Sequence, residues 1–153
     1  MYYKIMDSPL GDLILIANKQ ALHRISFEKK TLPTLEKINT PILQLAEHEL
    51  QKYFKGSLKV FSVPIFLHGS NFQVAVWNHL KLLPYGKTTS YGEVAKAIGN
   101  PKAVRAVGQA NNKNPIPIII PCHRVIGKNG SLTGYSGKME NKRTLLKFEG
   151  IKP

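Results

Sequence analysis

A proline-punctuated run in the second half of the chain limits most strongly what these residues can form. Residues 114–121 read Asn-Pro-Ile-Pro-Ile-Ile-Ile-Pro. Each proline lacks an N–H donor and has a fixed φ angle, so the run can be neither a helix interior nor a central strand. We therefore predict a stiff, extended and buried segment. It holds Cys122 and His123 in a fixed place, and a helix can begin at Cys122.

Cys122 is the only cysteine, so it can form neither an internal disulfide nor a cysteine-rich zinc site. A free cysteine is usually buried and inert, but an adjacent base or a helix N-terminus can convert it into a nucleophilic thiolate. His123 is a candidate base, acting directly or through a water. Glu149 is a candidate for the third group that often orients such a histidine. A packed histidine and a solvated carboxylate are the alternatives.

The chain carries a net charge of +13, concentrated in its second half. Residues 1–67 have a net charge of +3, whereas residues 68–153 have +10. A basic half suggests a polyanionic partner, most commonly nucleic acid, although solubility or an anionic membrane surface also fits. The length of 153 residues fits one domain or two small lobes. Since we find no signal peptide and no membrane-spanning stretch, we expect a cytoplasmic protein.

The first 67 residues are predicted to form a small structural lobe. Short apolar or alternating runs predict strands over residues 2–6, 13–17 and 21–27, most simply as an antiparallel meander. Apolar residues at helical spacing predict a helix over 41–55, with Gly56 at the C′ position that follows it. A short strand over 59–63 comes next, and 68–70 form a linker.

The remainder is predicted to be mainly helical, which makes the fold α+β. Helices are expected over 71–83, 91–98, 103–111 and 140–149, with a capping box between Ser90 and Glu93. The second and third of these, joined by a tight glycine-containing turn, form a candidate helix-turn-helix, although two packed helices that bind no DNA give the same pattern.

Two further segments are unusual in composition. The helix over 103–111 consists of small residues apart from Arg105 and Gln109. It could enter a narrow groove of DNA, or it could simply pack closely against another helix. A loop with glycines at 127, 130, 134 and 137 surrounds Tyr135 and Ser136. Such a loop can bring backbone N–H and C=O groups close to a ligand.

Together these segments closely resemble the O(6)-alkylguanine-DNA alkyltransferase family. The resemblance spans residues 72–150, whereas residues 1–67 resemble the ribonuclease H-like N-terminal lobe of the family only in outline. The motifs that carry it are Pro84-Tyr85-Gly86, Ser90-Tyr91-Gly92, the run from Gly99 to Gly108, Asn114-Pro115, Pro121-Cys122-His123-Arg124-Val125 and Thr133-Gly134-Tyr135-Ser136-Gly137.

The resemblance implies a role for each matching residue. Cys122 accepts the alkyl group, His123 deprotonates it through a water, Glu149 orients His123, and Asn114 braces the active-site turn. Tyr91 donates a proton to the leaving guanine and crowds the phosphate. The helix around Ala103 and Gly108 lies in the minor groove, where Arg105 fills the gap left by the flipped base. Arg124 is expected to contact DNA. The expected base pocket consists of Val125, Tyr135, Ser136 and Gly137.

The resemblance also implies the reaction. An alkyl group passes once from O6-alkylguanine, and also from O4-alkylthymine, in double-stranded DNA to Cys122, with no metal and no organic cofactor. We expect a monomer. Lys138 and Thr144 depart from the residues that many relatives have, and we expect them to affect loop flexibility and packing. The alternatives are a non-catalytic protein that binds alkylated DNA, a helix-turn-helix regulator, and a Cys-His hydrolase that turns over repeatedly.

Overall fold

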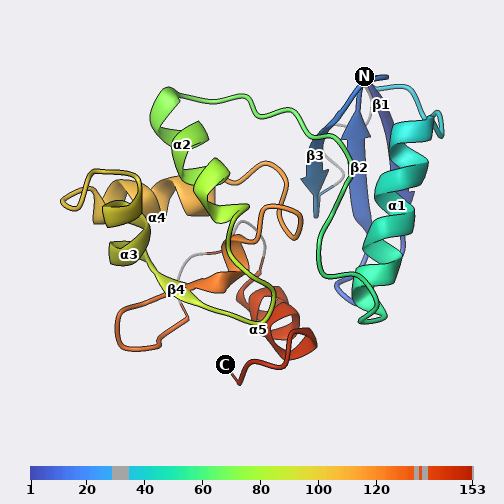
Figure 1. The fold of residues 1–153 in the computed structure, drawn as a ribbon. Coiled ribbons are helices and arrows are strands. Elements are labelled where there is room, and N and C mark those ends of the chain that lie inside the picture. Colours follow the sequence, from blue (N-terminus) through green and yellow to red (C-terminus); the bar gives the residue numbers. More distant parts are fainter. Residues whose placement is uncertain (29–34, 133–134, 136–137, 153) are drawn as a thin grey trace. The chain divides into compact units, whose positions relative to one another are not determined.

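The computed structural model describes residues 1–28, 35–132, 135 and 138–152, and the chain forms two compact units, Met1–Leu67 and His68–Pro153 (Figure 1). Within this described part, no helix combines the length and the apolar character that a membrane span requires.

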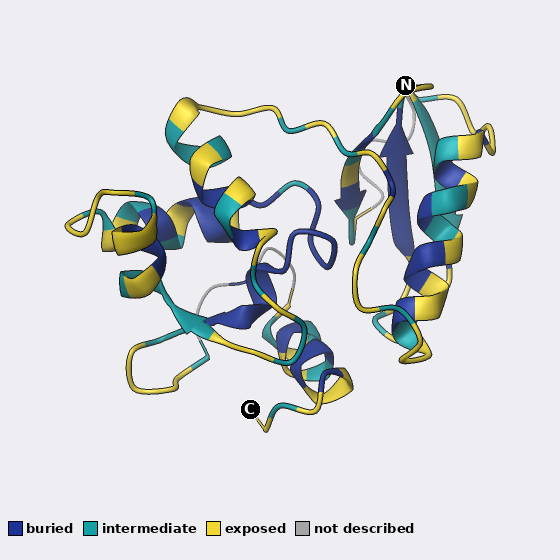
Figure 2. Cartoon of the chain, viewed as in Figure 1, coloured by how far each residue is buried: buried dark blue, intermediate teal, exposed yellow. Residues whose placement is uncertain are grey.

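The first unit is an antiparallel meander covered by one helix. Strands β1 (Tyr2–Met6), β2 (Leu13–Ala17) and β3 (Leu22–Ser26) lie in the order β1-β2-β3, and α1 (Pro41–Phe54) packs against all three. Every residue of β2 is buried (Figure 2). The predicted strands are confirmed, because turn residues separate them and their apolar side chains form the core.

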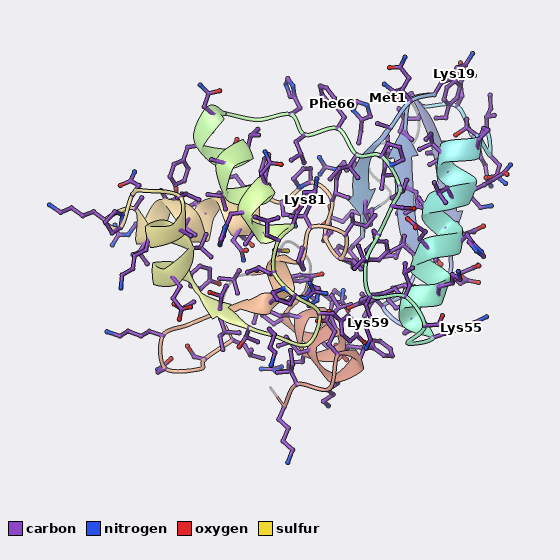
Figure 3. All side chains as sticks on the ribbon, in the orientation of Figure 1. Met1, Lys19, Lys55, Lys59, Phe66 and Lys81 are labelled. Atoms are coloured by element: carbon purple, nitrogen blue, oxygen red, sulfur yellow. The ribbon has the colours of Figure 1, made fainter. Side chains whose placement is uncertain are left out.

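Helix α1 begins and ends as its sequence indicates. The Thr40 side chain accepts a hydrogen bond from the Leu43 amide at the N-terminus. At the other end Gly56 has a φ of 79°, and the amides of Gly56 and Ser57 donate to the carbonyls of Tyr53 and Lys52. This is a Schellman ending, so the prediction that Gly56 is the C′ residue is confirmed. Exposed lysines such as Lys55 extend away from this core (Figure 3).

The predicted strand over 59–63 is wrong, and the buried Glu49 of α1 explains why. Its Oε1 accepts hydrogen bonds from the amides of Ser62 (3.0 Å) and Val63 (2.8 Å), and its Oε2 accepts from the Ser62 hydroxyl at 2.7 Å. Those amides therefore cannot pair with a strand. The chain reaches the sheet only later, at an isolated bridge between Ile65 and Leu22.

The second unit places five helical segments around one short strand pair. Its elements are α2 (Asn71–Leu80), β4 (Thr89–Ser90), α3 (Tyr91–Ala97), α4 (Val104–Asn112), the 3-10 helix η2 (Cys122–Arg124), β5 (Val125–Ile126) and α5 (Met139–Phe148). Helices α3 and α4 pack against each other as the predicted helix-turn-helix. Strand β4 pairs in parallel with β5, which joins the start of α3 directly to the residues after Cys122.

The helices of this unit follow the predicted boundaries to within one residue, except at the end of α2. Helix α2 ends at Leu80 rather than Leu83, and the amides of Leu82 and Leu83 donate to carbonyls three residues earlier as the chain approaches Pro84. The Ser90 side chain caps α3 by accepting from the Glu93 amide, as expected. The predicted capping box would also have the Glu93 carboxylate accept from the Ser90 amide. The contact that the structure shows for this carboxylate is instead with the Thr89 hydroxyl, at 3.2 Å.

Candidate active site around Cys122

The segment that leads to Cys122 is buried, as predicted, but it is not extended. Ile116, Ile118 and Ile120 are almost completely buried. The chain turns back on itself, with the Ile120 amide donating to the Ile116 carbonyl at 2.9 Å and Ile118 at a φ of 77°. A positive φ is a rare conformation for a β-branched residue and costs about 1–3 kcal/mol. The prolines therefore frame a tight turn instead of stiffening a straight segment.

Asn114 holds this turn closed with both ends of its side-chain amide. Its Nδ2 donates to the Ile120 carbonyl at 2.7 Å, and its Oδ1 accepts from the Ile116 amide at 2.9 Å. Asn114 is itself buried. These two bonds replace the strand pairing that Ile116 and Ile120 lack, and they place Cys122 at the first position of η2.

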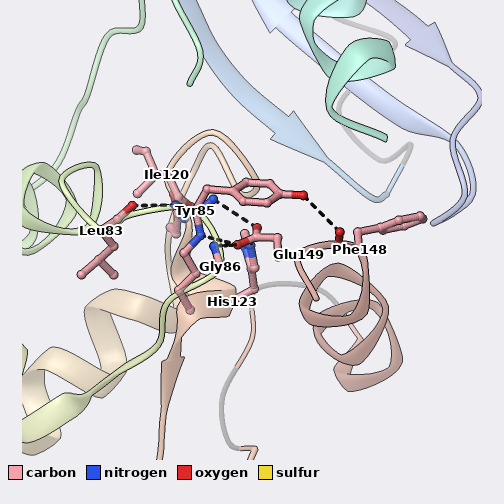
Figure 4. Close-up of polar contacts among 9 residues, drawn as sticks. Leu83, Tyr85, Gly86, Ile120, His123, Phe148 and Glu149 are labelled. Atoms are coloured by element: carbon pink, nitrogen blue, oxygen red, sulfur yellow. Dashed lines mark hydrogen bonds and ion pairs between the residues drawn. The ribbon is translucent and has the colours of Figure 1, made fainter. Parts of the chain in front are cut away.

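Cys122 is completely buried, and the side chain of the adjacent His123 is equally inaccessible. His123 Nε2 lies 2.6 Å from Glu149 Oε2 (Figure 4). A carboxylate can only accept a hydrogen bond, so Nε2 carries the proton in this pair. Burial lowers the pKa of His123 below its ordinary value of 6.5, against the opposing effects of the hydrogen bond and the charge of Glu149. The ring is therefore neutral, and its Nδ1 is the basic nitrogen.

Within the described residues, His123 Nδ1 has no hydrogen-bond partner although it is buried. A buried acceptor that is left unpaired costs about 1–3 kcal/mol, so Nδ1 is suited to accept a hydrogen bond from a water or from a reacting group. The geometry thus places a neutral imidazole nitrogen in the residue next to the only thiol of the chain.

The Glu149 carboxylate is surrounded by donors from two segments, the loop at Gly86 and the helix η2. Its Oε1 accepts from the Gly86 amide at 3.0 Å and from Arg124 Nε at 2.8 Å, and its Oε2 accepts from Arg124 Nη2 at 3.1 Å as well as pairing with His123. Glu149 lies immediately after α5, where the helix dipole disfavours a negative charge. The buried guanidinium offsets that cost.

Arg124 was predicted to contact DNA, and its environment contradicts this. The residue is 5% exposed, and its third nitrogen, Nη1, donates to the Leu83 carbonyl at 2.6 Å. Its guanidinium also lies over the Tyr85 ring, 5.7 Å from the centroid, and the Tyr85 hydroxyl donates to the Phe148 carbonyl (Figure 4). All of these contacts are within the chain, so Arg124 belongs to the buried network around Glu149 and not to the exposed basic surface.

Lys142 belongs to the site but was missed in the sequence. It is completely buried on α5, and its Nζ donates to the Val125 carbonyl at 2.7 Å. Burial lowers the pKa of Lys142 from 10.5 to about 8, and electrostatic attraction to Cys122 opposes part of that shift. The signal was available: Lys142 shares the i, i+3, i+4, i+7 stripe of α5 with Leu145, Leu146 and Glu149, where a solvated lysine is not expected.

The helix-turn-helix carries an exposed arginine, Arg105, and a glycine, Gly108, on the same helix α4. On α4, Val107, Ala110 and Asn111 face inward, whereas Arg105 is exposed. Tyr91, the first residue of α3, lies against Gly108, where an added Cβ would be 3.9 Å from the ring. Ala103 is the N-cap of α4 and is partly exposed. The structure therefore brings Tyr91, Gly108 and the N-terminal half of α4 together.

The predicted base pocket is described only in part. Val125 and Tyr135 are buried. Ser136 and Gly137 lie outside the described residues. Among the residues that the structure does describe, no group of three His, Cys, Asp or Glu side chains is arranged to hold a metal ion.

Comparison with known proteins accounts for both units. Residues 71–151 match the DNA-binding domain of 6-O-methylguanine DNA methyltransferase, and residues 1–67 match the ribonuclease-like domain of the same protein. A methylated-DNA–protein-cysteine methyltransferase of Methanosarcina acetivorans is 49% identical, with 98% of this chain and 99% of the relative covered. The constitutive enzyme of that name from Bacillus subtilis is 46% identical, with 98% and 96% covered.

Solved structures agree with the sequence comparisons. The crystal structure of the Mycobacterium tuberculosis protein OGT in complex with DNA superposes with a TM-score of 0.90 at 45% identity, covering 97% of this chain and 92% of that one. The two family matches together include residues of both units, and Cys122 lies within the matched range 71–151. The chain belongs to the 6-O-methylguanine DNA methyltransferase family.

Proposed function

We propose that this protein repairs alkylated DNA directly, by transferring the alkyl group from O6 of guanine to the sulfur of Cys122. The observation that carries the proposal is the neutral, buried His123, held by Glu149 at 2.6 Å and adjacent in sequence to Cys122. The relatives named methylated-DNA–protein-cysteine methyltransferases support the reaction. The relative that was crystallised with DNA supports the partner.

In the proposed chemistry, His123 Nδ1 takes the thiol proton of Cys122 through a water, which leaves a thiolate and an imidazolium. Glu149 stabilises the imidazolium and fixes the ring, while the ammonium of Lys142 favours the thiolate. The thiolate attacks the alkyl carbon, a C–S bond forms, and the bond from carbon to O6 breaks. The guanine leaves with its electron pair and takes a proton from the Tyr91 hydroxyl.

A thioether is not hydrolysed under ordinary conditions, so each protein molecule acts once. The chemistry needs neither a metal nor an organic cofactor. We propose that the protein also takes the alkyl group from O4-alkylthymine. We further predict that it is a monomer and that it is located in the cytoplasm.

The target atom lies inside the duplex and must be rotated out before it can react. We propose that α4 lies in the minor groove with Ala103 and Gly108 against the backbone, that Arg105 fills the vacated stack, and that Tyr91 crowds the target phosphate. The net charge of +10 on residues 68–153 supplies phosphate contacts that offset the cost of extrusion. Val125 and Tyr135, with Ser136 and Gly137, then line the base pocket.

The alternatives are less well supported. A non-catalytic protein that flags alkylated DNA needs no acceptor thiol, and a regulator needs no histidine base beside a cysteine. A hydrolase would release its product and react repeatedly, whereas the relatives' name identifies a protein cysteine as the acceptor.

Stoichiometry tests the proposal. When duplex DNA containing O6-methylguanine is present in large excess, we expect the number of repaired lesions to equal the number of protein molecules and then to stop rising. The Cys122→Ser variant should repair none while it still binds the duplex. Consumption of many lesions per protein molecule would contradict the single-use mechanism. Arg105→Ala should repair duplex DNA more slowly but react with the free base almost normally, and equal losses on both would exclude its role in the stack.

A further inference from the structure

Asn129 and Gly130 form the only Asn-Gly pair in the sequence, and the proposed mechanism gives them no role. They lie in a tight turn over residues 127–131, whose members after the first are all exposed. The Gly127 amide donates to the Ser131 carbonyl at 2.8 Å, and the Gly130 amide donates to the Gly127 carbonyl at 2.9 Å. The side chain of Asn129 is therefore accessible to solvent, in a turn that directly follows β5.

The Asn129 side chain is folded over the amide of the next residue. Its Oδ1 accepts a hydrogen bond from the Ser131 amide, two residues ahead, at 3.1 Å. In such an Asx turn the side-chain carbonyl lies beside the Gly130 nitrogen, and the hydrogen bond polarises the carbonyl at Cγ. Gly130 has a φ of 82° and carries no Cβ, so no side chain shields its nitrogen from Cγ.

Asn18 provides an internal comparison in the same kind of turn. Its Oδ1 accepts from the amides of Gln20 and Ala21, both at 2.8 Å, but the residue that follows it is Lys19. A Cβ on that residue crowds the approach of its backbone nitrogen to the side-chain carbonyl, whereas glycine leaves the approach open. The two turns thus differ in the residue that controls attack on the asparagine side chain.

We infer that Asn129 is a site of spontaneous deamidation and that the carboxylate formed there weakens the binding of the protein to DNA. The Gly130 nitrogen loses its proton and attacks Cγ, so an N–C bond forms, the Cγ–Nδ2 bond breaks, and ammonia leaves with that proton. Water then opens the cyclic imide to aspartate or isoaspartate, which makes asparagine a chemically labile residue. The Gly130 amide must first leave the Gly127 carbonyl, and because residues 128–131 are exposed, no core side chain has to move.

The position of the turn next to strands β4 and β5 explains why the new charge matters. The two strands are parallel and pair at their last residues, so the residues that follow them, Tyr91 and Gly127, lie at the same edge. The effect on DNA rests on the proposed function, in which Tyr91 crowds the target phosphate. Lys128 is an exposed cation at that edge. A carboxylate at position 129 offsets this positive charge and repels the phosphate.

The first experiment measures the modification itself and needs no DNA. The protein is kept in mildly alkaline buffer well below its melting temperature, and its peptides are mapped at intervals for isoaspartate and for a mass increase of about 1 Da. We expect Asn129 to convert at least about 10-fold faster than Asn18, which corresponds to a barrier lower by about 1.4 kcal/mol. A rate at Asn129 no higher than that at Asn18 would overturn the inference.

The second experiment measures the consequence by single-turnover methyl transfer at duplex concentrations below saturation. Fresh Asn129→Asp carries the aspartate product, and it should react roughly 5-fold more slowly than the fresh wild type at low salt, which corresponds to about 1 kcal/mol. The difference should shrink at high salt, and the reaction with free O6-methylguanine should be unchanged. Asn129→Ser is the matched control, because serine cannot deamidate but keeps an oxygen for the Ser131 amide. It should match the fresh wild type and keep its rate after ageing.

Equal duplex rates for Asn129→Asp and the wild type at low salt would overturn the inference. So would an equal loss on the duplex and on the free base, which would indicate a distorted active site and not repulsion of DNA. Fresh wild type that transfers no methyl group at all would instead contradict the proposed function. The two failures are distinguishable, because the deamidation rate is measured without DNA.

Discussion

Replacing Glu149 with glutamine tests the buried network at its most connected point. The carboxylate accepts hydrogen bonds from the Gly86 amide and from two nitrogens of Arg124, and it pairs with His123 at 2.6 Å. Glu149→Gln keeps the shape but exchanges one acceptor oxygen for an NH2 group. That group must face N–H donors of Arg124 or His123, and the buried Arg124 loses its counter-charge.

Two effects of different size should follow. Removing one partner of a buried ion pair costs about 3–5 kcal/mol. For a protein of this length, 1 kcal/mol shifts the melting temperature by about 2–4 °C, so we expect melting to occur ~10 °C lower. An NH2 group in place of Oε2 also favours the tautomer with the proton on Nδ1, which removes the proposed base. Loss of a positioned base slows a reaction about 10²- to 10⁴-fold.

Both effects can be measured separately. Trp77 is the only tryptophan and is buried in α2, so its fluorescence reports the unfolding of residues 68–153. Single-turnover methyl transfer, measured well below the melting temperature of the variant, reports the base. Glu140→Gln is the matched control, since Glu140 is exposed in the first turn of the same helix and should change neither quantity greatly. A folded Glu149→Gln protein that reacts within about 3-fold of the wild type would refute the assignment of His123 as base.

Three further outcomes follow from the structure. Glu49→Gln removes the charge that holds the Ser62 and Val63 amides, so it should destabilise the first unit by about 2 kcal/mol in urea titrations followed by circular dichroism, with methyl transfer retained. Folding lowers the pKa of His123, so the unfolded chain binds the proton more readily and the free energy of unfolding should fall as the pH drops below about 6.5; His123→Asn should lose this dependence. Lys142→Met should slow methyl transfer at neutral pH roughly 10-fold while DNA affinity is unchanged, because the thiolate loses a nearby positive charge.

The regular elements could be predicted from the sequence because local patterns determine them. Alternation and turn residues located the three strands, and helical spacing with Gly56 located α1. The strand predicted over 59–63 does not form because the amides of Ser62 and Val63 bind Glu49. That residue lies thirteen and fourteen positions earlier, and no local pattern connects its carboxylate to them. The prediction of an extended segment before Cys122 was wrong for a similar reason. Its prolines exclude helix and central strand, but the turn depends on the amide of Asn114 and on the positive φ of Ile118.

The part of the site that could be predicted is the part that the motif around Cys122 implies. The pairing of His123 with Glu149 was expected, and the structure brings the two side chains together. The resemblance placed Arg124 on the DNA, whereas its burial against Glu149 is a tertiary contact that the motif does not reveal. Lys142 was missed because it is a polar residue on the buried face of α5, and what it faces depends on how that helix packs against the Cys122 segment.

The central claim is that Cys122 receives the alkyl group, and mass spectrometry of the intact protein tests it most directly. After reaction with a duplex containing O6-methylguanine, the account predicts one added methyl group per chain, located on Cys122 by peptide mapping, while Cys122→Ser gains none. A protein that binds the lesion and restores guanine without any change in its own mass would contradict the account.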